Sequence, residues 1–197
     1  MKYILAAVIA YLLGSVCSSI PLSKRRKGVD IRTKGSGNAG ATNVARVFGI
    51  RAGFITLGLD MAKTVAAMLI GQQLCGVMGE AISGAFCIIG HCFPLYFGFK
   101  GGKGVSVGAA LGLMTGLPVF AVIIAVFLVT AFASRKVSLG SILAAVTLPV
   151  ASFIFNAPTP LLAMNAFSAV LVVLMHRENI RRLINGTEGD FKPGKSC

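Results

Sequence analysis

Acidic residues are scarce in this sequence, which has 6 Asp and Glu against 19 Lys and Arg and is only 13% charged over 197 residues. A soluble domain carries about 25% charged residues, so the deficit indicates a chain solvated by lipid. The basic excess would suit nucleic acid, but the apolar runs are too long for a soluble nucleic-acid binder. We therefore expect no nucleic-acid partner, and expect membrane lipids and phosphorylated substrates instead.

The sequence also has few residues that could hold a metal ion. It contains two histidines and five cysteines, and none of these forms a Cys-x-x-Cys pair or a cluster with ligand spacing. Cysteines in or beside apolar segments behave as small hydrophobic residues. We expect no metal and no cofactor, and we interpret the cysteines as core residues rather than ligands or disulfides: Cys17, Cys75, Cys87, Cys92 and Cys197.

The N-terminal apolar run lacks a clear cleavage signal. Lys2 followed by apolar residues has some likeness to a signal peptide. However, Gly14-Ser15-Val16 before Cys17 is a poor lipoprotein cleavage pattern, and no Ala-x-Ala follows. Four basic residues at 24–27 come directly after the run. These features favour a first membrane span that is retained.

Apolar runs dominate the rest of the chain, and a membrane-crossing helix needs about 20 such residues. The runs are 3–22, 53–74, 78–97, 105–133, 139–155 and 160–176. The fourth is too long for one helix, and Gly116-Leu117-Pro118 favours a break into 105–116 and 118–133. The sequence thus predicts an all-α integral membrane protein, a single domain over 1–197, with about seven transmembrane helices, some of them short. A five-span arrangement is the alternative.

Basic residues mark one side of the predicted domain. The connections after the first, third and fifth spans, with the C-terminal tail, hold 17 of the 19 Lys and Arg, because only Lys2 and Lys63 lie elsewhere. Positive loops stay in the cytoplasm, so we expect the N-terminus outside and the C-terminus inside. The outer connections are very short. The chemistry should therefore lie in the cytoplasmic segments, which are 23–47, 94–104, 134–140 and 176–197.

The first cytoplasmic segment contains a glycine-rich motif. It has the GxGxxG spacing of a dinucleotide-binding loop, but a basic loop precedes it and a membrane span follows it, so we reject that fold. Glycines still let backbone N–H groups converge on an anion, and hydroxyl, amide and guanidinium groups add donors. A flexible linker explains the glycines but not these donors. The predicted phosphate ligands are Gly35, Ser36, Gly37, Asn38, Gly40, Thr42, Asn43 and Arg46.

A second glycine-rich segment lies between the third and fourth spans. A Walker A loop would need Gly at 97 and Ser or Thr at 104, whereas the chain has Phe97 and Gly104. Two lysines among three glycines again suit phosphate, while a simple positive anchor explains only the lysines. The predicted ligands here are His91, Lys100, Gly101, Gly102, Lys103 and Gly104.

A third segment begins at the end of the last span. If it is helical, His176 and Asn179 share a face, which we assign to the site. Glu178 on the same helix can pair with Arg181 or Arg182, an ion pair that we assign to structure. An amphipathic interfacial helix is the alternative for this segment.

Two smaller pairs complete the set. Ser138 and Ser141, three residues apart at the start of the sixth span, join the predicted site, although serine also caps helices often. Asp60 and Lys63 lie three apart inside the second span. Ionisable groups at that depth are costly, so they pair with each other or line a polar cavity. We favour a structural pair.

Together these segments resemble the PlsY family of bacterial acyl-phosphate:glycerol-3-phosphate acyltransferases. The likeness runs nearly end to end, in order and spacing: GSGNAGATNVAR at 35–46, GLDMAK at 58–63, GHCFPLYFGFKGGKG at 90–104, the serine pair, and HRENIRRLINGTE at 176–188. The resemblance implies an enzyme of the bacterial plasma (inner) membrane with its active site on the cytoplasmic face. It would transfer a fatty acyl chain from acyl phosphate to the 1-hydroxyl of sn-glycerol 3-phosphate, giving lysophosphatidic acid and phosphate.

The implied chemistry makes limited demands on the protein. Acyl phosphate is already an activated mixed anhydride, so the enzyme has to position two anions and polarise the acyl carbonyl. We assign catalytic roles to Lys103, Ser36, His176 and Asn179. The proton acceptor stays open between His176 and the phosphate of the substrate, and a covalent acyl-Ser36 is unnecessary with so reactive a donor.

The His-x4-Asp dyad of another acyltransferase family is absent, because Tyr96 and Arg181 lie five residues beyond the two histidines. We therefore expect acyl-CoA to be ignored. A transporter for a small phosphorylated metabolite is the alternative function, since broken spans, basic glycine-rich loops and an intramembrane ion pair would suit one. The phosphate-binding features lie on a single face, however, whereas alternating access needs a site near the midplane.

Overall fold

Helices make up nearly all of the regular structure. The computed structural model describes residues 1–191, apart from the side chains of residues 26 and 27, so Cys197 and the end of the predicted tail lie outside the described residues. No strand occurs within residues 1–191, which confirms the all-α prediction. The helices are α1 (Lys2–Gly14), α2 (Ser19–Lys27), α3 (Ala41–Phe48), α4 (Ile50–Cys92), α5 (Val105–Thr115), α6 (Leu117–Ser134), α7 (Val137–Ile154), α8 (Thr159–Met175) and α9 (Arg177–Ile184), with 3-10 turns η1 (Ile31–Thr33) and η2 (Leu95–Phe97).

α4 folds back on itself at Cys75 and Gly76. Cys75 has φ −145° and Gly76 has φ 60° with ψ −153°, a conformation open to glycine because it has no Cβ. Beyond the bend the chain returns along its own first half, where a Cβ on Gly79 would overlap the carbonyl of Gly71. The second and third predicted spans are therefore two antiparallel helices with a break between them, as the sequence indicated.

The long fourth run is also broken where it was predicted to break. α5 ends at Thr115, α6 begins at Leu117, and Gly116 between them is not helical. Pro118 falls in the first turn of α6, where its missing N–H removes no helical hydrogen bond. The 11 residues of α5 rise about 17 Å, which is less than the ~30 Å of a bilayer core.

The first run, predicted as the span 3–22, lies within Lys2–Arg25, which is long and apolar enough to cross a membrane, but it contains a break that the sequence did not indicate. α1 ends at Gly14 and α2 begins at Ser19. The break is stabilised from α4, because Lys63 Nζ donates to the carbonyl oxygens of Gly14 at 3.0 Å and Val16 at 2.7 Å. An ammonium group thus satisfies helix-end carbonyls that would otherwise lack partners.

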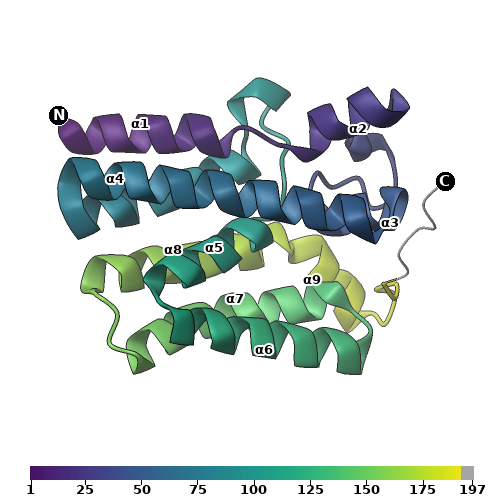
Figure 1. The fold of residues 1–197 in the computed structure, drawn as a ribbon. Helices are drawn as coiled ribbons and strands as arrows, with labels where there is room; N and C mark the ends of the chain where they lie inside the picture. The colour runs from purple at the N-terminus through teal and green to yellow at the C-terminus, as the bar shows by residue number, and fades with distance from the viewer. Residues whose placement is uncertain (192–197) are drawn as a thin grey trace.

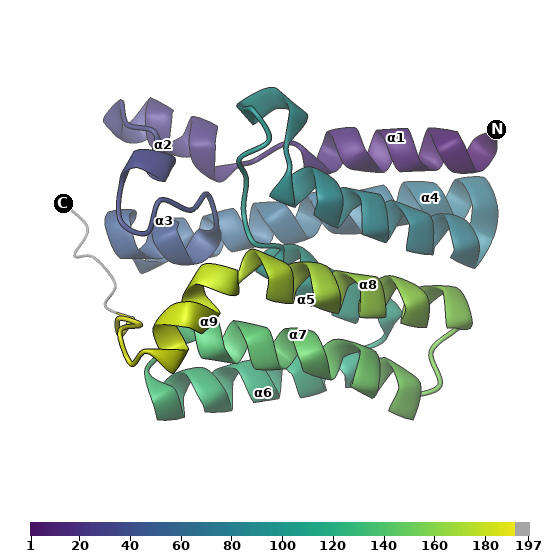
Figure 2. The same ribbon diagram turned by 180° about the vertical axis from the view of Figure 1, so that it is seen from behind.

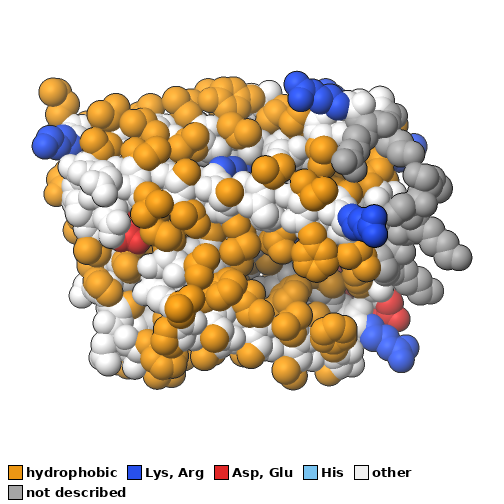
Figure 3. Space-filling view, in the orientation of Figure 1, with side chains coloured by type: hydrophobic (Ala, Val, Ile, Leu, Met, Phe, Trp, Pro, Cys, Tyr) orange, Lys and Arg blue, Asp and Glu red, His pale blue; other side chains and the backbone are white. Residues whose placement is uncertain are grey.

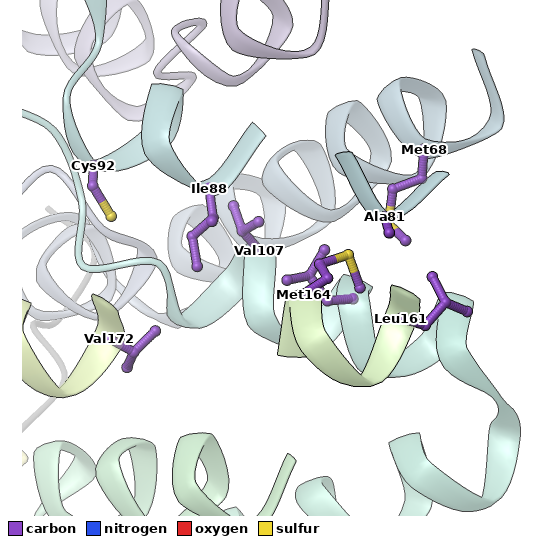
Figure 4. Packing of buried hydrophobic residues seen from close by; sticks show 9 residues of the cluster. Met68, Ala81, Ile88, Cys92, Val107, Leu161, Met164 and Val172 are labelled. Carbon is purple, nitrogen blue, oxygen red and sulfur yellow. The ribbon is translucent and has the colours of Figure 1, made fainter. Parts of the chain in front are cut away.

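The helices stack in layers, with α1 and α4 on one side, α6 and α7 on the other, and α5 and α8 between them (Figures 1 and 2). α4, α5 and α8 share the main hydrophobic core (Figure 4). Glycines bring α1 close to the second half of α4: a Cβ on Gly14 would overlap the backbone of Cys87, and one on Gly90 would overlap that of Tyr11. The buried core residues are Met68, Ala81, Ile88, Cys92, Val107, Leu111, Leu161, Met164 and Val172.

The outer surface of the bundle is apolar. Figure 3 shows hydrophobic side chains over the broad face between the two ends, with most of the Lys and Arg atoms at the end where α2 and α3 lie. Within residues 1–191, four helical segments are long and apolar enough to cross a membrane, or five if α8 and α9, bent by 59°, form one broken span. That count treats α4 as one segment despite its fold-back. The molecule has the features of a multi-pass membrane protein, while the predicted seven crossings and the orientation of the termini stay predictions.

Candidate active site

The first glycine-rich loop is organised around the amide of Asn43. Asn43 is 1% exposed, its Oδ1 accepts from the backbone N–H of Ser36 at 2.8 Å, and its Nδ2 donates to the carbonyls of Lys34 and Asn38, both at 2.9 Å. The N–H of Gly37 also bonds within the loop, where it donates to the carbonyl oxygen of Lys34 at 3.0 Å. The amide of Asn43, which we predicted to bind phosphate, therefore shapes the loop, and outward-facing side chains are left to meet a ligand.

An ion pair beside this loop reaches the second glycine-rich segment. Arg32 donates to the Asp30 carboxylate through Nη2 at 2.8 Å and Nε at 3.1 Å. Its Nη1 donates to the carbonyl oxygens of Phe97 at 2.7 Å and Lys100 at 3.3 Å. Side-chain hydrogen bonds from Arg32 lower the pKa of Asp30, so the carboxylate stays ionised. This Asp30–Arg32 clamp joins the two loops.

The glycines of the second loop seat it on the end of α4. The N–H of Gly101 donates to Cys92 O at 3.2 Å, and the N–H of Gly102 donates to His91 O at 3.1 Å. A Cβ on Gly102 would overlap the imidazole of His91. These two N–H groups therefore face the helix rather than a phosphate, and the glycines permit a close approach that places Lys103.

Lys103 meets α9, α7 and the C-terminal segment in one polar network. Its ammonium donates to the side-chain oxygen Oδ1 of Asn179, and Asn179 Nδ2 donates to Glu188 Oε1 at 2.7 Å. Ser138 donates to the same Glu188 oxygen, and Arg182 Nε donates to the other at 2.7 Å. Burial lowers the pKa of Lys103, and the nearby charge of Arg182 lowers it further. The predicted Lys103, Asn179 and Ser138 are thus brought together.

Glu188 is the shared acceptor of this network. Burial by itself would raise its pKa, but hydrogen bonds from Ser138, Arg182 and Asn179 outweigh burial and lower it. The predicted pairing of Glu178 with Arg181 or Arg182 was wrong, because Arg182 pairs with Glu188 at 2.7 Å. Glu178 is exposed, and its charge acts to raise the pKa of Lys103.

His176 lies at the joint between α8 and α9. It is 3% exposed, and its Nδ1 is 2.8 Å from the carbonyl oxygen of Val172. A carbonyl only accepts hydrogen bonds, so Nδ1 carries a hydrogen and Nε2 of the neutral ring keeps its lone pair. The helix joint thus fixes the ring and leaves Nε2 as the group that can accept a proton.

The second histidine belongs to a different cluster. Asp60 and Lys63 form the predicted ion pair at 3.1 Å, almost fully buried. His91, 2% exposed, places Nδ1 3.2 Å from the ammonium of Lys63. His91 therefore joins the ion pair that holds α1 to α4, and its predicted phosphate-binding role has no support in this geometry.

Comparison with known proteins identifies the family of this chain. A family model described as glycerol-3-phosphate acyltransferase matches residues 4–186. The chain belongs to this acyltransferase family. Among curated relatives, the glycerol-3-phosphate acyltransferase of Carboxydothermus hydrogenoformans is 40% identical over 193 residues, covering 98% of each chain. That of Geotalea daltonii is 44% identical over 186 residues, covering 93% of this chain and 94% of its own.

Solved structures agree with this membership. Two crystal structures of PlsY, an integral membrane glycerol 3-phosphate acyltransferase, match this fold over 98% of this chain and 96% of theirs. The glycerol 3-phosphate form has a TM-score of 0.92 and 35% identity, and the lysophosphatidic acid form has 0.90 and 34%. The acyltransferase chain described here is therefore a multi-pass membrane protein of the PlsY type.

Several predicted ligands of this acyltransferase keep their polar groups accessible. Ser36, Thr42 and Lys100 are exposed, and the charge of Arg46 is close enough to Lys103 to lower the pKa of that lysine. Ser141 instead donates to its own helix, at the carbonyl of Val137, at 2.8 Å. No group of three or more His, Cys, Asp and Glu that could hold a metal occurs in the described part of the chain.

Sequence reasoning missed three residues of the acyltransferase site region: Asp30, Arg32 and Glu188. Asp30 and Arg32 lie two residues apart just before the first motif, and an acid followed by a base at this spacing is a weak signal that many turns share. Glu188 ends the third motif, so the family resemblance covered it, but nothing local indicated that it would accept from three partners.

Proposed function

We propose that this chain transfers a fatty acyl group from acyl phosphate to the 1-hydroxyl of sn-glycerol 3-phosphate. The observation that carries the proposal is the network that joins Lys103, Asn179 and Ser138 through Glu188, together with Arg46 of α3, whose charge reaches Lys103. Two cations and several neutral donors suit a reaction between two phosphorylated substrates. The relatives are named for glycerol 3-phosphate, and the acyl phosphate donor follows from the PlsY resemblance.

The chemical step is a direct acyl transfer. The 1-hydroxyl oxygen attacks the acyl carbonyl carbon, the bond from that carbon to the phosphate oxygen breaks, and phosphate leaves with the electron pair. Lys103 and Arg46 offset the repulsion between the two anions. The hydroxyl proton passes either to Nε2 of His176 or to an oxygen of the substrate's own phosphate. No acyl-Ser36 intermediate is required.

The acyltransferase is further proposed to lie in the bacterial plasma membrane with the site on the cytoplasmic face. The support is the concentration of Lys and Arg at the end of the molecule that carries α2 and α3 (Figure 3), because basic segments stay in the cytoplasm. Free glycerol 3-phosphate would then reach the site from water, and the acyl donor would reach it from the membrane.

A single assay tests the proposal. Purified protein in detergent is incubated with labelled glycerol 3-phosphate and either acyl phosphate or acyl-CoA. We expect labelled lysophosphatidic acid with acyl phosphate and none with acyl-CoA. A transporter makes no product in detergent, because there is no membrane for its cargo to cross. Efficient acylation from acyl-CoA would contradict the proposed donor.

A further inference from the structure

The connection between α4 and α5 exposes four large apolar side chains next to the active-site loop. Phe93 is 39% exposed, Leu95 47%, Tyr96 54% and Phe99 55%. They follow one another along seven residues and precede the glycines that place Lys103. Such a cluster is unusual on a surface in contact with water. We refer to residues 93–99 as the apolar loop.

The apolar loop lies beside α1 rather than beyond its end. The hydroxyl of Tyr11 donates to the carbonyl of Phe93 at 2.9 Å, and the N–H of Leu95 donates to Ser15 Oγ at 3.2 Å. Both partners belong to the last turn of α1 or directly follow it. Figures 1 and 2 show the loop projecting sideways from the bundle, past α1. The apolar loop is therefore held beside the break between α1 and α2.

Backbone hydrogen bonds and the packing of Phe97 fix the conformation of the apolar loop. Gly98 and Phe99 both have positive φ, at 65° and 58°, and a non-glycine residue holds that conformation only when its surroundings enforce it. The N–H groups of Phe97 and Phe99 both donate to Pro94 O, at 3.2 and 3.0 Å. Phe97 packs inward against the cluster that contains Cys17. With Phe97 anchored, the strained backbone directs the other side chains outward.

The surroundings of the apolar loop match lipid on one side and head groups on the other. The exposed apolar surface of α1, which includes Ile4, Leu5 and Val8, continues toward the loop, and Figure 3 shows hydrophobic atoms along that upper edge. Exposed cations, Lys24 and Lys100, lie on the adjoining segments. Aromatic residues between an apolar band and basic residues are typical of the membrane–water interface.

We propose that the apolar loop inserts into the phospholipid bilayer at the level of the glycerol and upper acyl chains, and so sets the depth of Lys103. The occupant of this surface is bilayer phospholipid. The loop would hold the active site against the membrane, where a lipid-tailed substrate arrives. This inference concerns the placement of the site and does not depend on which acyl donor is used.

The chain contains no tryptophan, so single-tryptophan reporters have no background. Tyr96→Trp and Phe99→Trp keep an aromatic ring at each position. Each variant is reconstituted into phosphatidylglycerol–phosphatidylcholine vesicles with bromine either near the glycerol or near the acyl-chain ends. Val146→Trp, at the middle of α7, is the deep control, and Lys34→Trp, on the exposed loop before α3, is the aqueous control.

We expect both loop reporters to lose most of their emission to bromine near the glycerol, little to bromine at the chain ends, and little to aqueous acrylamide. The Val146→Trp reporter should respond in the opposite order to the two bromine positions. Quenching by acrylamide to the level of Lys34→Trp would overturn the proposal, because the loop would then lie in water. Protection from every quencher would overturn it too, because a second protein copy would then cover the loop. Unchanged melting temperatures check that the variants are folded.

Discussion

Glu188 shows how one side chain defines the active site at the scale of single residues. Its carboxylate accepts hydrogen bonds from Ser138, Asn179 and Arg182. Asn179 in turn accepts a hydrogen bond from Lys103 through Oδ1. Hydrogen bonds to an ionised acceptor are worth about 1.5–3 kcal/mol each. The position of Lys103 therefore depends on Glu188 through Asn179.

This dependence leads to a pH-dependent stability prediction for Glu188. Its pKa is lowered from the ordinary 4.5, so the ionised group contributes stability above about pH 4.5, and this contribution is lost as the pH falls through the lowered pKa. Glu188→Gln should reduce the free energy of unfolding at pH 7 by about 1.5–3 kcal/mol, and the difference from wild type should shrink in acid. Thermal melting in detergent over a pH series measures both.

Glu178→Gln is the matched control, because Glu178 is exposed on the same segment. Its effect should stay within about 0.5 kcal/mol. A constant difference between wild type and Glu188→Gln from neutral to acidic pH would show that the charge of Glu188 is not what stabilises the network.

His176 is the second residue whose role can be tested. If Nε2 accepts the proton, His176→Ala should lower kcat by about 100-fold or more while glycerol 3-phosphate still binds, as calorimetry can measure. His176→Asn restores a hydrogen bond toward Val172 O but offers no base near neutral pH. Recovery of most of the activity in His176→Asn would assign the proton to the substrate phosphate.

At the scale of elements, the site depends on how two loops are held together. The Asp30–Arg32 clamp binds the carbonyls of Phe97 and Lys100 from the first loop, and these carbonyls flank the strained turn at Gly98 and Phe99. Gly101 and Gly102 then tie the chain to the end of α4. Lys103 is the next residue, so its position is set by both attachments.

Removing the clamp should therefore weaken substrate binding more than turnover. Arg32→Ala should raise the KM for glycerol 3-phosphate roughly tenfold to a hundredfold, equivalent to about 1.5–3 kcal/mol, with a smaller change in kcat. Guanidinium ion added to the assay should restore part of the loss, because it can occupy the vacated position between the two loops. Steady-state kinetics in detergent measures both effects.

Arg51→Ala removes an exposed arginine at the start of α4 and is the matched control. Its kinetics should match those of the wild type with and without guanidinium. A fall in kcat at constant KM in Arg32→Ala, without rescue, would mean that the clamp acts on stability alone.

At the scale of the whole molecule, the number of helix breaks predicts which segments lie on each side of the membrane. With seven crossings, Met78 and Asn156 lie outside, and Lys34 and Arg135 lie inside. Cysteines introduced at these positions, in a background without the native cysteines, should react with an impermeant maleimide in intact cells only at 78 and 156. Opposite sides for 34 and 135 would contradict seven crossings, because residues 105–133 would then form one crossing instead of two.

Features of the fold that depend on neighbouring residues could be read from the sequence alone. Hydropathy and glycine located the breaks at Gly76 and Gly116, since a helix ends for local backbone reasons. Charge separation and the three motifs predicted the site region, because they too are properties of neighbouring residues. The interruption of the first run was missed, because it is stabilised by Lys63 from another helix.

Only the tertiary structure decided which polar groups meet. Arg182 pairs with Glu188 rather than with Glu178, and His91 joins Asp60 and Lys63 rather than a phosphate site. The physical reason is that a hydrogen bond needs its two atoms within about 3 Å. That distance is set by how remote segments pack, which the spacing of residues along the chain does not encode.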